Sequence, residues 1–61
     1  MSDDELRRLV HDLRSPLAVI DGFAGLLVSD PELPDDKRAD YTRRISEAAA
    51  EMRALLDQAA K

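Results

Sequence analysis

The sequence predicts an all-α protein: an antiparallel helical hairpin that dimerises into a four-helix bundle. Two stripes of apolar residues repeat every three or four positions, and a short segment rich in Pro and Asp separates them. The composition is 44% hydrophobic but only 3% aromatic and 36% charged, which is typical of helical bundles. Because the chain has 61 residues and no cysteine, one hairpin has only a small core, and we expect two copies to pair.

The first helix is expected to span about residues 3–28, because its apolar residues continue in phase throughout. This stripe comprises Leu6, Val10, Leu13, Leu17, Ile20, Ala24 and Leu27. Pro16 lies in the middle of the stripe without shifting its phase, which predicts one helix with a kink rather than two helices. Ser2 or Asp3 is suited to cap the first turn.

A loop over about residues 29–35 and a second helix over about residues 36–59 complete the hairpin. The loop is rich in Pro and Asp, and the carboxylates that follow Pro34 suit the positive end of a helix. The second stripe comprises Tyr41, Ile45, Ala48, Met52, Leu55 and Ala59, widened by Ala49 and Leu56. Charged residues at helical neighbour spacing predict a solvated face with weak ion pairs, formed by Asp40, Arg43, Arg44 and Glu47.

Charge and hydropathy argue against several classes of function. The net charge is -4, and acidic and basic residues are mixed along both halves, so we expect no nucleic-acid partner. No stretch approaches the roughly 18 apolar residues of a membrane span, and the acidic start of the chain is unlike a secretory signal. We expect no direct membrane contact and a cytoplasmic location, whether or not the parent protein is anchored in a membrane.

The single histidine, His11, is predicted to point away from the helical seam. At about 100° per residue, it lies roughly 160° from the centre of the first stripe. Its side of the helix carries small and apolar residues instead of the Lys and Glu of an ordinary solvated face. These residues are Ser15, Ala18, Val19, Gly22, Gly25 and Leu26. Two interpretations stay open: a docking surface for a partner, or glycines that ease packing inside the bundle.

The residues around His11 favour a nucleophile over a metal ligand or a hydrolytic triad. No second His and no Cys accompany it, and nothing near Ser15 presents an oxyanion hole. Neutral imidazole is nucleophilic at physiological pH, and the adjacent Asp12 can hold the proton of one ring nitrogen. Arg14 and Ser15 follow on the next turn, where a cation and a hydroxyl suit a phosphoryl group. Pro16 loosens the backbone there by removing one helical hydrogen bond.

The segment His11-Asp12-Leu13-Arg14-Ser15-Pro16-Leu17 resembles the H-box of sensor histidine kinases, whose usual form is His-Glu-Leu-Arg-Thr-Pro-Leu. The similarity continues through the rest of the first helix, the acidic loop and the second helix, so it covers essentially the whole chain. This resemblance implies a homodimeric dimerisation and histidine-phosphotransfer domain. In such a domain, His11 accepts the γ-phosphoryl group of ATP and passes it to an aspartate on a response-regulator receiver domain.

The resemblance also implies roles for individual residues. Asp12 would be the acid/base neighbour of the phosphoacceptor, in place of the commoner Glu, and Pro16 would be the helix kink. Ser15 stands where family members with phosphatase activity carry Thr or Asn. Since serine keeps the hydroxyl but lacks the methyl group that restricts its rotamer, phosphatase activity is in question. The surface that receives the partner domains would comprise Arg14, Ser15, Ala18, Val19 and Gly22.

The chain lacks the sequence boxes with which this family binds ATP. Its two glycines, Gly22 and Gly25, do not lie in a phosphate-cradling loop. We therefore expect no cofactor in this chain, with ATP and Mg²⁺ acting through a separate ATP-binding domain, and no activity from the chain alone. It would be an excised domain of a larger kinase or a short protein that depends on another subunit. Two alternatives are a non-catalytic dimerisation or inhibitor module that mimics such a domain, and a monomeric phosphotransfer domain, which would need four helices.

Overall fold

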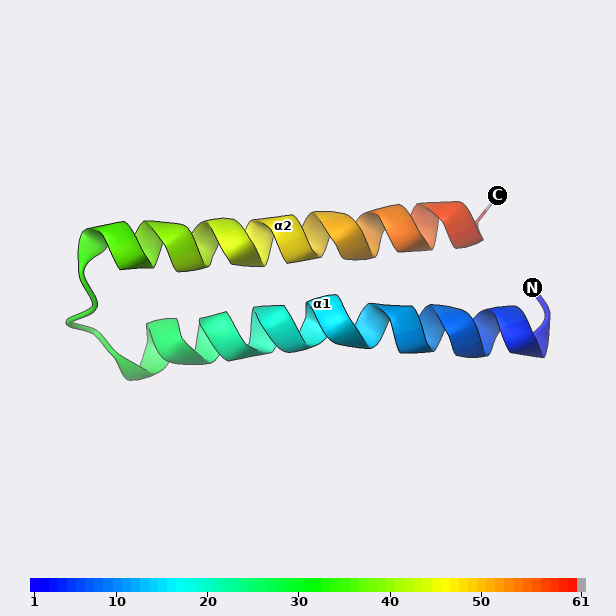
Figure 1. Cartoon of the computed structure of the whole chain (residues 1–61), viewed down its shortest axis with the longest axis horizontal. Helices are drawn as coiled ribbons and strands as arrows, with labels where there is room; N and C mark the ends of the chain where they lie inside the picture. Colours follow the sequence, from blue (N-terminus) through cyan, green and yellow to red (C-terminus); the bar gives the residue numbers. More distant parts are fainter. Residues whose placement is uncertain (61) are drawn as a thin grey trace.

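Two long helices lie antiparallel and form a hairpin. The computed structural model describes residues 1–60, with α1 at Asp3–Ser29 and α2 at Asp35–Ala59. The hairpin measures 47 × 17 × 10 Å. Figure 1 shows the two helices side by side along their length, with the start of α1 and the end of α2 at the same end of the molecule. The predicted all-α hairpin is confirmed.

Local hydrogen bonds stabilise the first turn of α1 and the loop between the helices. Ser2 is the N-cap of α1, and its Oγ accepts a hydrogen bond from the Glu5 backbone N–H at 3.2 Å. In the loop, the Asp30 carboxylate accepts a hydrogen bond from the Glu32 N–H at 3.2 Å, as aspartate often does in turns. α2 begins after Pro34, with Asp35 and Asp36 in its first turn, where carboxylates stabilise the positive helix end.

The seam between the helices is narrow and centred on two small residues. Pro16 of α1 is less than 2% exposed and Ala48 of α2 is 6% exposed. Towards the loop, the rings of Phe23 and Tyr41 join the two helices, with their centroids 5.0 Å apart. The guanidinium of Arg44 lies 5.7 Å from the centroid of the Phe23 ring, which adds a cation–π contact.

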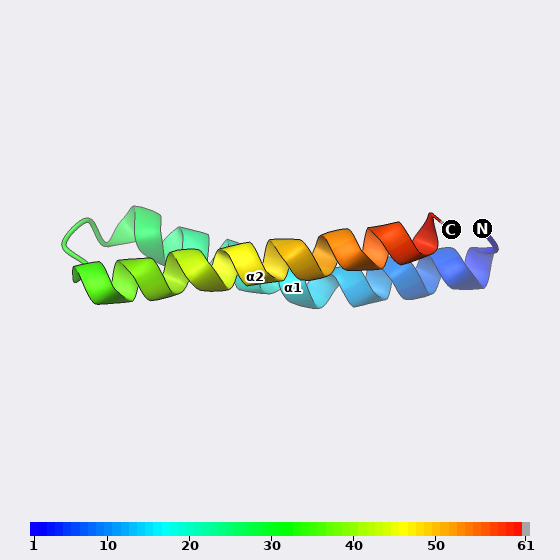
Figure 2. The same cartoon turned by 90° about the horizontal axis from the view of Figure 1, so that it is seen from above.

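Pro16 lies within one uninterrupted helix, since α1 continues on both sides of it. Figure 2 shows that the axis of α1 is not straight: it changes direction near the middle of the helix, in the light blue to cyan segment that contains Pro16 by residue number. A proline removes one backbone donor and crowds the preceding turn, so a bend at this place has a local cause.

The hairpin uses only part of the predicted apolar stripe of α1. Leu13, Ile20, Ala24 and Leu27 are partly buried, whereas Leu6, Val10 and Leu17 stay exposed. Leu9, Pro16 and Phe23, which lie outside the predicted stripe, are partly or fully buried. The apolar surface of α1 is therefore wider than one helix can cover, and α2 covers one side of it.

Within residues 1–60, neither helix holds an apolar stretch of the length needed to cross a membrane.

Candidate functional site

His11 projects from α1 on the side opposite α2. Its side chain is 86% exposed, as the helical spacing predicted. The imidazole Nδ1 lies 3.3 Å from Oδ1 of Asp12, the next residue along the chain. The Asp12 side chain is 42% exposed, and solvent screening makes this contact weak in energetic terms. The main effect of the contact is to orient the imidazole ring of His11.

The contact with Asp12 selects one form of the imidazole ring. A carboxylate can only accept a hydrogen bond, so the contact favours the tautomer in which Nδ1 carries the proton and donates it to Asp12. The lone pair then resides on Nε2, at the exposed edge of the ring. His11 and Asp12 together therefore present an accessible nitrogen nucleophile with its partner nitrogen already occupied.

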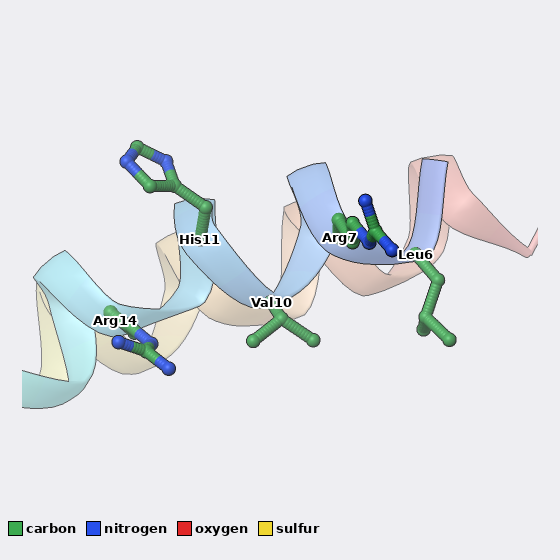
Figure 3. Close-up of a pocket in the computed structure, with 5 residues that line it drawn as sticks. All are labelled: Leu6, Arg7, Val10, His11 and Arg14. Carbon is green, nitrogen blue, oxygen red and sulfur yellow. The ribbon is translucent and has the colours of Figure 1, made fainter. Parts of the chain in front are cut away.

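An open notch adjoins the histidine on one side of α1. We call it the His11 notch, and it is lined by Leu6, Arg7, Val10, His11 and Arg14. Figure 3 shows the imidazole projecting from the helix, with Arg7 before it and Arg14 after it along the helix. The sequence had singled out Arg14 but not Arg7. Arg7 precedes His11 by four residues, about one helical turn, and this spacing is the signal in the sequence that identifies Arg7.

The remaining predicted site residues fall into two groups. Ser15 is exposed but does not line the His11 notch, whereas Pro16 is buried towards α2. Further along α1 lies an apolar hollow lined by Ala18, Val19, Gly22, Phe23 and Leu26. It continues into a groove between the helices, lined by Val19, Phe23, Arg44, Glu47, Ala48 and Glu51. Phe23 and the α2 residues of this groove were absent from the predicted site.

The two glycines of α1 have no packing role inside the hairpin. A Cβ atom built on Gly22 or Gly25 would meet no other heavy atom within 4 Å, apart from its chain neighbours and the backbone of its own helix. Neither glycine has the positive φ that a side chain would resist. The glycines therefore do not ease packing between α1 and α2, and both a docking surface and packing against a second hairpin are compatible with their open surroundings.

The charges of α2 are arranged differently from those around His11. Arg43 donates hydrogen bonds to Asp40 and Glu47 at 2.6 Å each, and Arg44 donates to Asp40 at 3.0 Å. The hydrogen bonds from Arg44 and then Arg43 lower the pKa of the Asp40 carboxyl. Those from Asp40 and then Glu47 raise the pKa of Arg43. This cluster is the solvated charged face that the sequence predicted.

No metal site is evident in the part of the chain that the structure describes. Across residues 1–60, the His, Asp and Glu side chains form no group of three or more with the arrangement of a metal-binding site.

The α-helical hairpin exposes one histidine beside a carboxylate, an arrangement that suits an imidazole nucleophile. Residues 1–59 match the His Kinase A (phospho-acceptor) domain, and the chain belongs to this family. The resemblance seen in the H-box is thereby confirmed. The chain is a phosphoacceptor domain of the kind found in sensor histidine kinases.

A curated relative supports the same family. Over 56 residues the chain is 32% identical to the sensor protein VanS of Enterococcus faecium, an alignment that covers 92% of this chain and 15% of that protein. The chain therefore spans about 15% of the length of this relative. No solved structure matches the chain.

Proposed function

We propose that His11 accepts the γ-phosphoryl group of ATP held by a separate catalytic domain and relays it to an aspartate of a response-regulator receiver domain. The observation that carries this proposal is the geometry of His11: an imidazole whose side chain is 86% exposed, with Nδ1 3.3 Å from Asp12. Such a ring offers Nε2 to a partner domain without competition from the rest of the hairpin. We place the reaction in the cytoplasm, where ATP is available.

In the transfer, this chain supplies the imidazole of His11 and the carboxylate of Asp12, and the partner domains supply ATP and the receiving aspartate. Nε2 attacks the γ-phosphorus, an N–P bond forms, and the bond to the β,γ-bridging oxygen breaks, with its electron pair leaving on ADP. Asp12 stabilises the positive charge that the ring acquires by accepting a hydrogen bond from Nδ1–H. In the second step an aspartate oxygen attacks the phosphorus, and the N–P electron pair returns to Nε2. Mg²⁺ would accompany ATP on the catalytic domain.

A second copy of the chain would cover the exposed apolar strip of α1. Leu6, Val10 and Leu17 follow each other at helical spacing and are 50%, 45% and 52% exposed. On α2, Leu56 is also exposed. Each hairpin thus keeps apolar surface that a symmetric partner can bury, which supports a homodimeric four-helix bundle.

The receiver domain would dock beyond His11 on α1. Ser15 is exposed, and Ala18, Val19 and Gly22 line the apolar hollow, so small residues let another backbone approach closely. Arg14, next to His11, would meet the phosphoryl group as it arrives or departs. Ser15 occupies the position linked to phosphatase activity in the family, and its unrestricted hydroxyl favours relay over efficient hydrolysis.

The test is transfer of labelled phosphate from ATP by an active histidine-kinase catalytic domain supplied in trans. The chain has one histidine, so we expect acid-labile and base-stable label at His11, and His11→Gln should remove it completely. Addition of a receiver domain should then discharge the label onto an aspartate. Absence of label, under conditions that phosphorylate a control phosphoacceptor domain, would instead support the non-catalytic dimerisation or inhibitor module.

A further inference from the structure

Arg7 lies beside His11 and has no role in the transfer described above. We propose that Arg7 is a phosphate-binding residue, which forms with Arg14 a pair of guanidinium groups that hold the phosphoryl group on His11. The ligand class is a tetrahedral phosphoryl dianion attached to nitrogen. This inference deepens the proposed function and rests on it, since it assumes that His11 is the residue that carries the phosphoryl group.

The helical spacing brings Arg7 and Arg14 to the same side of α1 as the notch. Arg7 precedes His11 by four residues and Arg14 follows it by three, and neighbours at these two spacings lie next to each other on a helix surface. All three line the His11 notch (Figure 3). The imidazole itself points away from the helix, so a group bound to Nε2 lies outside the notch, within reach of long arginine side chains that extend from its two ends.

Neither arginine is already engaged. Within residues 1–60, Arg7 and Arg14 take part in none of the ion pairs, whereas Arg43 and Arg44 of α2 are paired with carboxylates. The other lining residues of the notch, Leu6 and Val10, are apolar. No carboxylate lines the notch, and the nearest acid to the ring is Asp12, whose contact is with Nδ1. The notch therefore carries two cations without an anion.

The adjacent Arg8 is placed differently and provides a natural comparison. It lines two other hollows, one shared with Asp4 and Glu5, the other with Glu5 and Asp12. Carboxylates thus line both hollows that adjoin Arg8, where they compete with any added anion. Arg7 and Arg8 are the same residue type, and each lies within one turn of His11, but only Arg7 lines the His11 notch, whose lining includes no carboxylate.

A guanidinium suits the proposed ligand because its planar fork donates two hydrogen bonds to two phosphoryl oxygens at once. The phosphoryl group carries between one and two negative charges near neutral pH, because its second pKa lies at about 6. Two neighbouring cations favour the doubly charged form. The expected consequence is a lower second pKa for the phosphoryl group on His11 than it would have beside neutral side chains.

The test is ³¹P NMR titration of the full chain after phosphorylation by phosphoramidate. This reagent transfers its phosphoryl group to the imidazole nitrogen and releases ammonia, so no kinase domain is needed. Against the wild type, we expect Arg7→Gln to raise the phosphoryl pKa by about half a unit, in line with the strength of exposed ion pairs. Arg8→Gln, which removes the same charge one residue away, should raise it by less than half as much, and Arg7→Lys should restore part of the effect.

Equal shifts for Arg7→Gln and Arg8→Gln, or no shift for either, would overturn the role of Arg7, because only a general charge effect would remain. The failure of the proposed function has a different signature. In that case phosphoramidate gives the expected pKa difference, but a kinase catalytic domain places no label on His11. Circular dichroism of each variant checks that the exposed substitutions leave the helices formed.

Discussion

The two helices of the hairpin differ in how many large apolar side chains they leave exposed and in how their arginines are paired. α1 carries six of the large apolar residues that stay exposed after Met1: Leu6, Val10, Leu17, Val19, Leu26 and Val28, whereas Leu56 is the corresponding residue of α2. The charges follow the same division. In α2, Asp40 and Glu47 hold Arg43 and Arg44, while no arginine of α1 is ion-paired within the described residues.

This difference separates a helix with many exposed groups from one whose groups are more often paired or buried. On α2, Asp40 and Glu47 already pair with Arg43 and Arg44, and Leu56 is the large apolar residue that it leaves exposed, so less of this helix calls for a partner. α1 presents an exposed histidine, arginines outside any ion pair of the described residues, and apolar patches on more than one side. Such a surface is unfavourable in an isolated molecule and is explained by partners that cover different parts of it in turn. Four predictions test this division, from the largest expected effect to the smallest.

The dimer should depend on one side of α1. We expect Leu17→Glu to weaken self-association about a thousandfold, because each dimer loses two buried leucines worth about 2 kcal/mol apiece. Leu26→Glu is the matched control, since Leu26 is similarly exposed (46% against 52%) but lies nine residues on, about 180° round the helix. Sedimentation equilibrium gives both dissociation constants. Equal weakening by the two variants would show that no single side of α1 forms the dimer.

The reactivity of His11 should depend on its carboxylate neighbour. Asp12→Asn removes the negative charge and allows the amide to donate to Nδ1, which would trap the unreactive tautomer, so we expect phosphorylation from ATP to slow about a hundredfold. Asp21→Asn, at an exposed position of the same helix, should leave the rate unchanged. Single-turnover labelling measures both rates. A normal rate in Asp12→Asn would mean that the contact of 3.3 Å has no part in the reaction.

A side chain at one of the open glycines of α1 should stabilise the hairpin but hinder access to the apolar hollow. Gly22→Ala is expected to stabilise the hairpin by about 0.5–1 kcal/mol, because alanine is the better helix former and its Cβ meets nothing nearby. The same methyl group should slow transfer to a receiver domain several-fold by obstructing the apolar hollow. Asp57→Ala on α2 improves helix propensity without touching the hollow. Melting temperatures and transfer rates of both variants separate the effect on stability from the effect on docking. An unchanged transfer rate in Gly22→Ala would contradict docking of the receiver domain at the apolar hollow.

The paired charges of α2 should produce a small effect that depends on pH. Hydrogen bonds from Arg44 and Arg43 hold the pKa of Asp40 below its ordinary value of 3.8. A lowered pKa in the folded state means that the ionised carboxylate contributes stability above about pH 3.8, and that this contribution is lost as the pH falls through the lowered pKa. The melting temperatures of the wild type and Asp40→Asn should therefore differ by a few degrees at most near neutral pH and converge in acid. A difference that persists at about pH 2 would assign it to helix propensity instead.

Much of the site follows from local pattern, and the exceptions have identifiable causes. Helical spacing alone placed His11 on the side away from α2, and the H-box identified its neighbours Asp12, Arg14 and Ser15. Arg7 escaped notice because a surface arginine in an amphipathic helix is common, and only the shared notch distinguishes it from Arg8. Phe23 escaped because it lies outside the stripe of period 3.5, on the side of α1 that α2 covers.

By itself, the sequence determined the two helices, the loop between them and the direction of His11, because capping residues, turn residues and apolar periodicity all act over a few neighbouring positions. Only the tertiary structure decided which part of a wide apolar surface meets α2. Periodicity gives the angle of a residue about its own helix axis but not the angle at which a second helix packs. That packing angle buries Pro16 against α2, leaves Leu6, Val10 and Leu17 for a partner, and keeps the two glycines of α1 open.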